Sequence, residues 1–311
     1  MKTLALIVGV IVAGTILATY LFPGAIYEVS MRVERSAAGL HTRSLEVDGI
    51  RYSYTDSESG VPLVLLHGFT ADKDHWTRVA RHLTGEYRVI APDLPGFGAS
   101  TRDPALDYSI DSQVGRLASL VDEIGLDKFH LGGSSMGGAI AAVYAARFPD
   151  RVSSLWLLAP AGVITDKTSD MERILFLNGE HPLIPGNRQE FEETLDFVFV
   201  KRPWIPAPMR RHLASVAAER QDLRRQIFAD LLDDSGHVVR MPLNDIVTGL
   251  DIPTLVVWGR LDRVLHPGGA TKLEALLDNE TVELMSGVGH LPMLEQPKPT
   301  ADRFLQFQRE R

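Results

Sequence analysis

The sequence contains no cysteine, and this absence excludes disulfides, thiolate chemistry and cysteine-based zinc sites. An excess of positive charge is also missing, because the formal net charge is -8 at neutral pH. An acidic chain presents no broad basic surface, which argues against a nucleic acid as a partner. The ten histidines lack the His-x-x-x-His spacing that is typical of metal ligands. We therefore expect neither a metal nor a cofactor.

Charged residues are absent from one long stretch near the amino terminus. The 20 residues from Thr3 to Phe22 carry no charge, and a helix of about 20 residues spans a hydrocarbon core of about 30 Å. We therefore predict a transmembrane anchor over residues 1–24. A cleaved signal peptide fits less well, because its apolar region of about 7 to 15 residues ends at a small-x-small site. A buried globular helix also fits less well, because nothing upstream can pack around it.

Two further predictions concern this anchor. Ala5, Gly9 and Ala13 recur every fourth residue, so they offer a face for homodimerisation in the membrane; the alternative is that small residues are simply common in such helices. Beyond Pro23, apolar residues continue at helical spacing among charged ones, which predicts an amphipathic juxtamembrane helix over 25–42. We expect a single-pass membrane protein, although the basic residues flanking the span do not decide its direction.

The rest of the chain has the pattern of an α/β fold. From residue 45, short apolar runs alternate with helical patterns, which predicts a mostly parallel central sheet with helices on both faces. The pair Asp48-Gly49 predicts an antiparallel hairpin at its start. Further along, about 90 residues without strand patterns are too many for a loop and should form a helical cap, or lid. The expected limits are 43–162 and 252–311 for the core and 163–251 for the cap.

Two adjacent serines stand between glycines in the stretch "HLGGSSMGG", residues 130–138. A strand that turns sharply into a helix around a nucleophile needs the pattern Gly-x-Ser-x-Gly. Centred on Ser135 the pattern is complete, whereas centred on Ser134 its last position is Met136. Ser135 is therefore the candidate nucleophile, at a helix end whose dipole favours a developing anion. An ordinary glycine-rich turn is the alternative, and a phosphate loop is disfavoured because its Walker and Gly-x-Gly-x-x-Gly patterns are missing.

A serine hydroxyl becomes a nucleophile only when a base takes its proton and a carboxylate orients that base. Asp262 follows the strand pattern of "PTLVVWGRLD", and His290 lies in the glycine-rich "MSGVGHLPMLEQP". The order Ser, Asp, His is the one required of a nucleophile on such a strand-to-helix turn. Alone, each residue is most simply a surface carboxylate or a loop histidine, but the three together predict a catalytic triad.

An oxyanion hole is the fourth element of this chemistry. It needs one backbone N–H from the residue after the nucleophile, Met136, and one from the loop after "PLVLLHGF", for which Phe69 is the candidate. We interpret His67 as a structural residue that hydrogen-bonds loop backbone, and Asp93 as a residue that shapes its turn.

These segments together resemble the α/β-hydrolase superfamily. The matching stretches are "LLHGF", "DLPGFGAS", "GSSMGG", "WGRLD" and "GHLPMLEQP", over about residues 45 to 310. An uncharged amino-terminal stretch followed by "HGFTADKDHW", "SIDSQVGRL", "GGSSMGG" and "LLAPAG" is similar to membrane-anchored monoacylglycerol lipases and single-span bacterial phospholipases A. The resemblance implies hydrolysis of lipid carboxylic esters by Ser135, Asp262 and His290. It also implies a single-pass protein of a bacterial inner membrane, with the catalytic domain in the periplasm. Relatives often carry Asn, Thr or His where this chain has Ser134.

The predicted function is thus a membrane-anchored serine carboxylester hydrolase of the phospholipase A, lysophospholipase or monoacylglycerol lipase type, acting through an acyl-enzyme. One alternative is a hydrolase of small soluble esters or of carbon–carbon bonds with the same triad. A second is a triad-bearing protein that binds ligands with little turnover. Dehalogenases and epoxide hydrolases use a carboxylate nucleophile, so Ser135 argues against both.

The cap sequence suggests contact with lipid. Residues 201–225 hold seven Lys/Arg against two acidic residues, with Trp204, Ile205 and Met209 among them. This mixture suits an anionic lipid surface, and a solvated helix face is the alternative. Five apolar cap residues are candidates either to line an acyl tunnel or only to pack the cap: Phe191, Leu195, Phe197, Phe199 and Phe228.

Overall fold

A computed structural model describes residues 3, 14, 17, 19–179, 181–232 and 242–311 of the chain. Most of the predicted anchor, including the face formed by Ala5, Gly9 and Ala13, lies outside these residues. Within the described part, we find no helix with the length and apolar character needed to cross a bilayer. The anchor therefore stays a prediction from the sequence.

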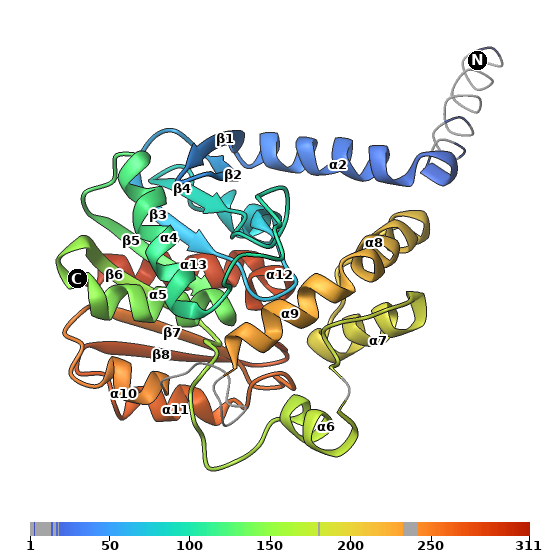
Figure 1. Ribbon diagram of the computed structural model, residues 1–311. Coiled ribbons are helices and arrows are strands. Elements are labelled where there is room, and N and C mark those ends of the chain that lie inside the picture. The colour runs from blue at the N-terminus through green and yellow to red at the C-terminus, as the bar shows by residue number, and fades with distance from the viewer. Residues whose placement is uncertain (1–2, 4–13, 15–16, 18, 180, 233–241) are drawn as a thin grey trace.

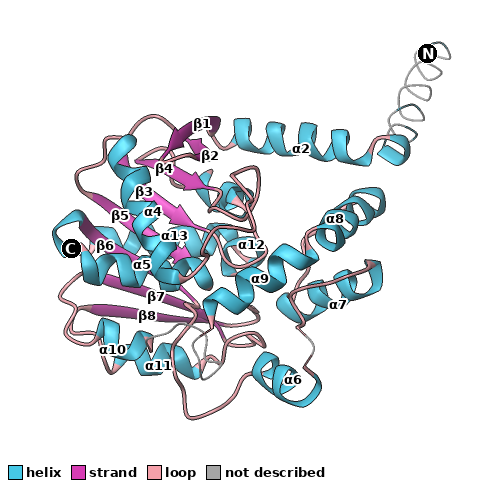
Figure 2. Ribbon diagram, in the orientation of Figure 1, coloured by secondary structure: helices cyan, strands magenta, loops and turns pink. Residues whose placement is uncertain are grey.

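The centre of the molecule is a sheet whose strands cross the domain side by side (Figures 1 and 2). Among the described residues, eight strands form one sheet in the order β1-β2-β4-β3-β5-β6-β7-β8. Neighbouring strands run parallel from β4 to β8, whereas β1 pairs antiparallel with β2, and β2 with β4. The strands are β1 (His41–Val47), β2 (Ile50–Asp56), β3 (Val61–Leu66), β4 (Tyr87–Pro92), β5 (Phe129–Ser134), β6 (Val152–Leu158), β7 (Thr254–Gly259) and β8 (Glu280–Met285).

The predicted hairpin forms the antiparallel edge. Val47 of β1 faces Ile50 of β2 across the two-residue turn. Asp48 and Gly49 have φ angles of 51° and 76°, which is the left-handed backbone that this type of tight turn requires. The sequence prediction for this segment is confirmed.

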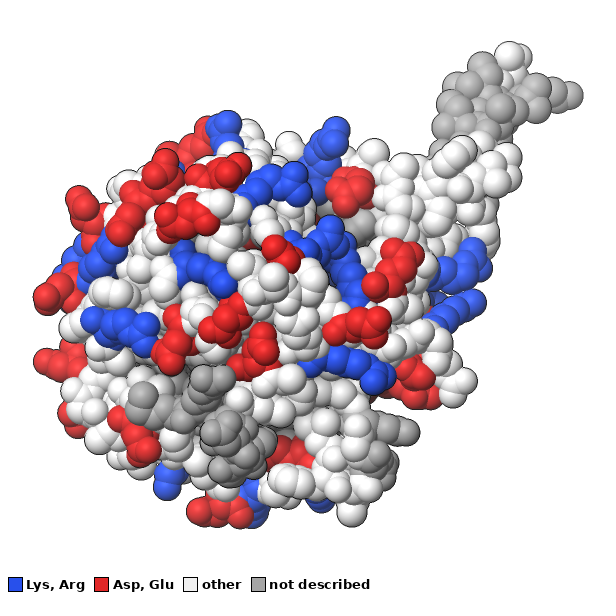
Figure 3. Space-filling view, in the orientation of Figure 1, with Lys and Arg blue, Asp and Glu red and all other residues white. Residues whose placement is uncertain are grey.

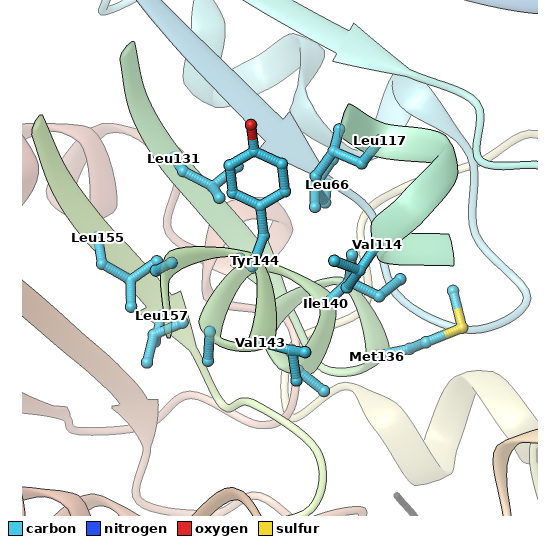
Figure 4. Close-up of a cluster of buried hydrophobic side chains, with 14 of the residues drawn as sticks. Leu66, Val114, Leu117, Leu131, Met136, Ile140, Val143, Tyr144, Leu155 and Leu157 are labelled. Carbon is cyan, nitrogen blue, oxygen red and sulfur yellow. The ribbon is translucent and has the colours of Figure 1, made fainter. Parts of the chain in front are cut away.

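Helices cover both faces of the sheet, because successive residues of a buried strand point to opposite sides. Val64 and Leu66 of β3 join the apolar cluster under α4 and α5, while Leu63 and Leu65 join the cluster on the other side. Figure 4 shows α5 lodged between the strands and α4, with Tyr144 among its inward side chains. The core helices are η1 (Lys73–Trp76), α3 (Thr77–Ala80), α4 (Ile110–Glu123), α5 (Met136–Arg147), η2 (Pro149–Arg151), α11 (Gly268–Glu274), α12 (Pro292–Glu295) and α13 (Pro297–Arg309).

Five helices stand between β6 and β7 in the chain, and four of them lie together beside the strand ends (Figure 1). These four are α6 (Asp170–Asn178), α7 (Arg188–Val198), α8 (Ala207–Glu219) and α9 (Gln221–Leu231), whereas α10 (Leu243–Val247) packs on the core helices α5 and α11. The first of them starts in a capping box, in which Ser169 accepts from Glu172 N and the Glu172 carboxylate accepts from Ser169 N. These helices occupy the segment expected to form the cap.

Near the amino terminus, helix α2 (Pro23–Ala37) begins at a proline, which suits a first helical position. It ends well before residue 42, because the chain turns at Gly39 (φ 70°) and enters β1 at His41. The helix lies beside α8 in Figure 1, and an added Cβ on Gly24 would meet the His212 ring at 2.8 Å. The amino-terminal helix is thus packed on the cap helices rather than free.

Candidate active site

Ser135 stands on the sharp turn between β5 and α5. Its backbone has φ 54° and ψ -119°, a conformation that costs an L residue free energy and is found at strand-to-helix turns that expose a nucleophile. An added Cβ on Gly133 would overlap the Gly137 carbonyl, and one on Gly137 would overlap the carbonyls of Leu66 and His67. The two glycines of the pattern are therefore required by the close approach of β5, α5 and the end of β3.

Ser134 has a different environment from its neighbour. It is the last residue of β5, fully buried, and its hydroxyl has no hydrogen-bond partner in the described part of the chain. Ser135 is anchored through its backbone, because its N–H donates to Leu158 O at 3.0 Å and its carbonyl accepts from Ala161 N at 3.0 Å. The side chain of Ser135, in contrast, lines a cavity. The geometry supports the choice of Ser135 over Ser134.

Asp262 and His290 lie together after β7 and β8. His290 Nδ1 is 2.8 Å from Asp262 Oδ2, and because a carboxylate only accepts, Nδ1 carries the proton and Nε2 is left as the base. The same Oδ2 also accepts from Trp258 Nε1 at 3.0 Å, while Oδ1 accepts from the N–H groups of Val264 and Leu265. Four donors thus hold the Asp262 carboxylate in place. The hydrogen bond from the Trp258 indole was not predicted from the sequence.

The loop that carries His290 is tied to the cap. His290 N donates to Val198 O at 2.9 Å. Glu295 accepts from Gly289 N through one oxygen and from Val200 N and Lys201 N through the other, at 2.8 to 2.9 Å. Glu295 stands in the "GHLPMLEQP" stretch, but no sequence pattern indicates that it joins two distant segments. Its carboxylate holds the histidine loop against the segment after α7.

The two predicted oxyanion donors stand next to Ser135, because Met136 follows it in the sequence and Phe69 follows Gly68, which abuts it. Gly68 leaves room for this approach, since an added Cβ would come within 3.2 Å of Ser135 Cβ. Among the described residues, neither the Phe69 N–H nor the Met136 N–H donates to a protein acceptor. The Phe69 ring is held by cap rings, with centroids 5.8 Å from Phe228 and 5.7 Å from His181. Two free N–H groups beside a nucleophile are what an oxyanion hole requires.

His67 and Asp93 shape the loops beneath the site, as expected. His67 is fully buried; its Nε2 accepts from Leu94 N and its Nδ1 lies 2.8 Å from Gly68 O. Burial lowers the pKa of His67, so the ring is neutral and holds the loop backbone through its two hydrogen bonds. Asp93 accepts from Lys73 Nζ, Lys73 N and Ala99 N.

A cavity of about 290 Å³ connects these residues. Ser135, His290 and Phe69 line it, and no hydrogen bond joins the serine hydroxyl to the imidazole in the described structure. In free enzymes such contacts often tighten only when substrate binds. Asp262 and Met136 are buried and do not themselves line the cavity.

The five apolar cap residues divide into two groups. Phe191, Leu195 and Phe199 line the cavity. Phe197 packs in the core with the Arg263 guanidinium 4.7 Å above its ring, and Phe228 packs on Phe69. The acyl tunnel thus stays a prediction for the three cavity residues, and the other two pack against neighbouring side chains.

Comparison with known proteins agrees with this architecture. The family model described as the alpha/beta hydrolase fold matches residues 61–297, so the chain belongs to the α/β-hydrolase family. The expected fold class, a mostly parallel sheet with helices on both faces, is confirmed.

Similar proteins and solved structures show which enzymes within this family the chain resembles. The chain is 36% identical to Lipase 3 of Moraxella sp. (strain TA144), over 89% of this chain and 87% of that protein. It is 32% identical to monoacylglycerol lipase ABHD6 of Homo sapiens, over 92% and 88%. A crystal structure described as a membrane phospholipase A, a novel bacterial virulence factor, superposes with a TM-score of 0.89 at 38% identity, covering 100% of this chain and 99% of that one. The prediction of a carboxylic ester hydrolase is confirmed.

Proposed function

We propose that the chain hydrolyses carboxylic esters of lipids, with Ser135 as nucleophile, His290 as base and Asp262 as the group that orients it. The observation that carries this proposal is the 2.8 Å contact between His290 and Asp262, on a cavity that Ser135 also lines. The left-handed backbone at Ser135 supports the same assignment.

The reaction proceeds through an acyl-enzyme. Ser135 Oγ attacks the ester carbonyl while His290 Nε2 takes its proton, and the N–H groups of Phe69 and Met136 bind the oxyanion. His290 then protonates the leaving alcohol. Water, activated by the same imidazole, releases the acid and restores the serine.

The cavity wall supports a substrate with a long apolar part. Besides three cap residues, Leu213, Val216 and Ala217 of α8 and Met31 of α2 line it. A chain of methylene groups would transfer favourably into such a lining, at about 0.8 kcal/mol for each buried CH₂. The names of the relatives, which include lipases, a monoacylglycerol lipase and a phospholipase A, point to the same substrate class.

We further propose that the enzyme works at a membrane, anchored as a single-pass protein of a bacterial inner membrane with its catalytic domain in the periplasm. The uncharged stretch from Thr3 to Phe22 supports an anchor, and on the face drawn in Figure 3 the projecting end of the described chain is white, without basic or acidic side chains. Trp204 and the α6 residues Phe176 and Leu177 are 82 to 83% exposed, as expected of side chains that meet lipid. Homodimerisation through the anchor stays a prediction.

The test compares Ser135→Ala with Ser134→Ala in the full-length, detergent-solubilised protein. We expect the first to abolish hydrolysis of a monoacylglycerol, a lysophospholipid and a short soluble ester, and the second to retain it, because Ser134 Oγ is buried away from the cavity. A fluorophosphonate should label the wild type and Ser134→Ala but not Ser135→Ala. Retained turnover in Ser135→Ala would refute the triad, and turnover limited to the short ester would refute the lipid substrate.

A further inference from the structure

The cavity contains charged groups that the proposed reaction does not use. Six charged side chains line it: Glu34, Asp72, Asp74, Arg78, Arg220 and Arg224. Two of the carboxylates have a nearby cation, because Glu34 lies 3.6 Å from Arg78 and Asp74 lies 3.6 Å from Arg35. Three charges then remain, the guanidinium groups of Arg220 and Arg224 and the carboxylate of Asp72.

The two arginines come from the junction of the cap helices. Arg220 is the single residue between α8 and α9, and Arg224 lies one turn further along α9, so both side chains project from the same side of this helix. Neither guanidinium forms an ion pair with a carboxylate of the described residues. The contact found for them is a long one, from Arg224 Nη1 to Ala217 O at 3.4 Å.

This arrangement leaves a surplus of positive charge in the cavity. Burial lowers the pKa of Arg220, and burial together with Arg220 lowers that of Arg224 to about 10, so both stay charged at neutral pH. Burial opposes ionisation of Asp72, yet the positive charges of His75 and Lys73 keep its pKa below the usual value. Lys73 itself is paired with Asp93. Two cations face one anion.

The surplus is unusual for this chain, whose net charge is -8. Two half-buried guanidinium groups repel each other, and an arrangement of this kind is stabilised when an anion binds between them. The other basic residues of the segment 201–225 differ. Arg202 and Arg210 form ion pairs with Glu192, whereas Lys201, Arg211 and Arg225 are exposed.

We propose that Arg220 and Arg224 form a subsite for the phosphodiester of a glycerophospholipid or lysophospholipid substrate. A phosphodiester carries one negative charge, which balances the surplus, and guanidinium groups bind phosphate oxygens through paired N–H donors. The apolar wall of the same cavity would hold the acyl chain while Ser135 attacks its ester. The pair would thus favour phospholipids over neutral monoacylglycerols. This inference rests on the proposed function and names the substrate class within it.

The test measures kcat/KM for a lysophospholipid and for a monoacylglycerol of the same acyl chain, in mixed micelles. The full-length wild type is compared with Arg220→Gln, Arg224→Gln and the control Arg225→Gln, which removes an exposed charge from the same helix. We expect the ratio of lysophospholipid to monoacylglycerol activity to fall about tenfold or more in the first two and to stay constant in the control. Arg224→Lys should recover part of the ratio, because it restores the charge without the fork geometry.

Three outcomes would contradict the subsite while sparing the proposed function. The first is that neither Arg220→Gln nor Arg224→Gln changes the ratio of lysophospholipid to monoacylglycerol activity. The second is that this ratio falls equally in the control Arg225→Gln. The third is that added fatty acid inhibits the wild type but no longer inhibits the Arg220 and Arg224 variants, while the activity ratio stays the same. The two arginines would then bind the carboxylate of a fatty acid. A wild type that hydrolyses neither lipid would instead refute the proposed function. Thermal unfolding of each variant identifies any that fail to fold.

Discussion

The cavity has two walls that are built in different ways. The wall at the strand ends holds Ser135, His290 and Phe69 on buried loops, where glycines permit close backbone contacts. The opposite wall consists of helices α2, α7, α8 and α9, which contribute apolar and charged side chains, most of them half-buried. On the proposed function, the chemistry depends on backbone geometry, whereas substrate recognition depends on side chains from α2 and from the helices between β6 and β7. The following predictions test this division, beginning with the largest effect.

Asp262→Asn should nearly abolish turnover. An amide in place of the carboxylate would favour the wrong histidine tautomer, and we expect kcat to fall by about 10⁴-fold. The fold should persist, because the amide oxygen can still accept from the loop N–H groups of Val264 and Leu265. Steady-state hydrolysis of a soluble ester and the melting temperature provide the measurement. A loss smaller than about tenfold would mean that Asp262 does not orient the base.

Gly137→Ala should damage both the fold and the activity. The new methyl group would overlap the carbonyls of Leu66 and His67, so we expect a loss of about 2 to 4 kcal/mol in the free energy of unfolding. Gly85→Ala is the control, because nothing lies within 4 Å of an added Cβ there. Chemical denaturation followed by circular dichroism measures both variants. Equal stability of the two would contradict the close approach that we describe for the nucleophile turn.

Asp74→Asn should change how stability depends on pH. Burial, followed by the charge of Asp72, raises the pKa of Asp74 to about 7. The folded protein therefore binds this proton more tightly than the unfolded chain does, and the resulting stability is present below about pH 4 and is lost as pH rises through about 7. The groups that face Asp74 include Arg35, Lys73 and Asp93.

The measurement is the melting temperature at about pH 5 and about pH 8. The wild type should lose more stability over this interval than Asp74→Asn, by a few degrees, because the amide cannot ionise. Asp103→Asn serves as a control on another loop. A wild-type curve that runs parallel to that of Asp74→Asn would contradict the raised pKa.

Trp204→Ala should have the smallest effect. Its side chain is 83% exposed, so we expect binding to anionic lipid vesicles to weaken only a few-fold, by about 1 kcal/mol. Val61→Ala provides the matched control, since Val61 is exposed at the amino end of β3, away from the cap. Co-sedimentation with vesicles measures both. Equal binding by the two variants would exclude Trp204 from the lipid contact.

The two walls also differ in how far the sequence predicts them. The turn at Ser135 and the loops of Asp262 and His290 follow from short motifs, because tight backbone geometry demands particular residues at fixed spacing. The hairpin at Asp48-Gly49 is predictable for the same reason. Trp258 and Glu295 were missed because their partners lie on other loops, and a hydrogen bond between distant segments leaves no periodic pattern.

The helical wall was predicted less well. The seven basic residues of 201–225 form one pattern in the sequence, yet the structure divides them among ion pairs, the cavity and solvent. Residues 25–42 were predicted to form an amphipathic juxtamembrane helix, and their spacing did not indicate that Tyr27, Met31 and Glu34 of α2 line the cavity. Which side of an amphipathic helix meets a partner depends on tertiary packing, and spacing alone does not report it.

Glu295 has a consequence for how a lipid enters. Its carboxylate fastens residues 200 and 201 of the cap to the loop of the catalytic base. Moving the cap at that corner would require these hydrogen bonds to break or the loop of His290 to move with them. The opening of the cap and the position of the catalytic base are therefore coupled at this corner.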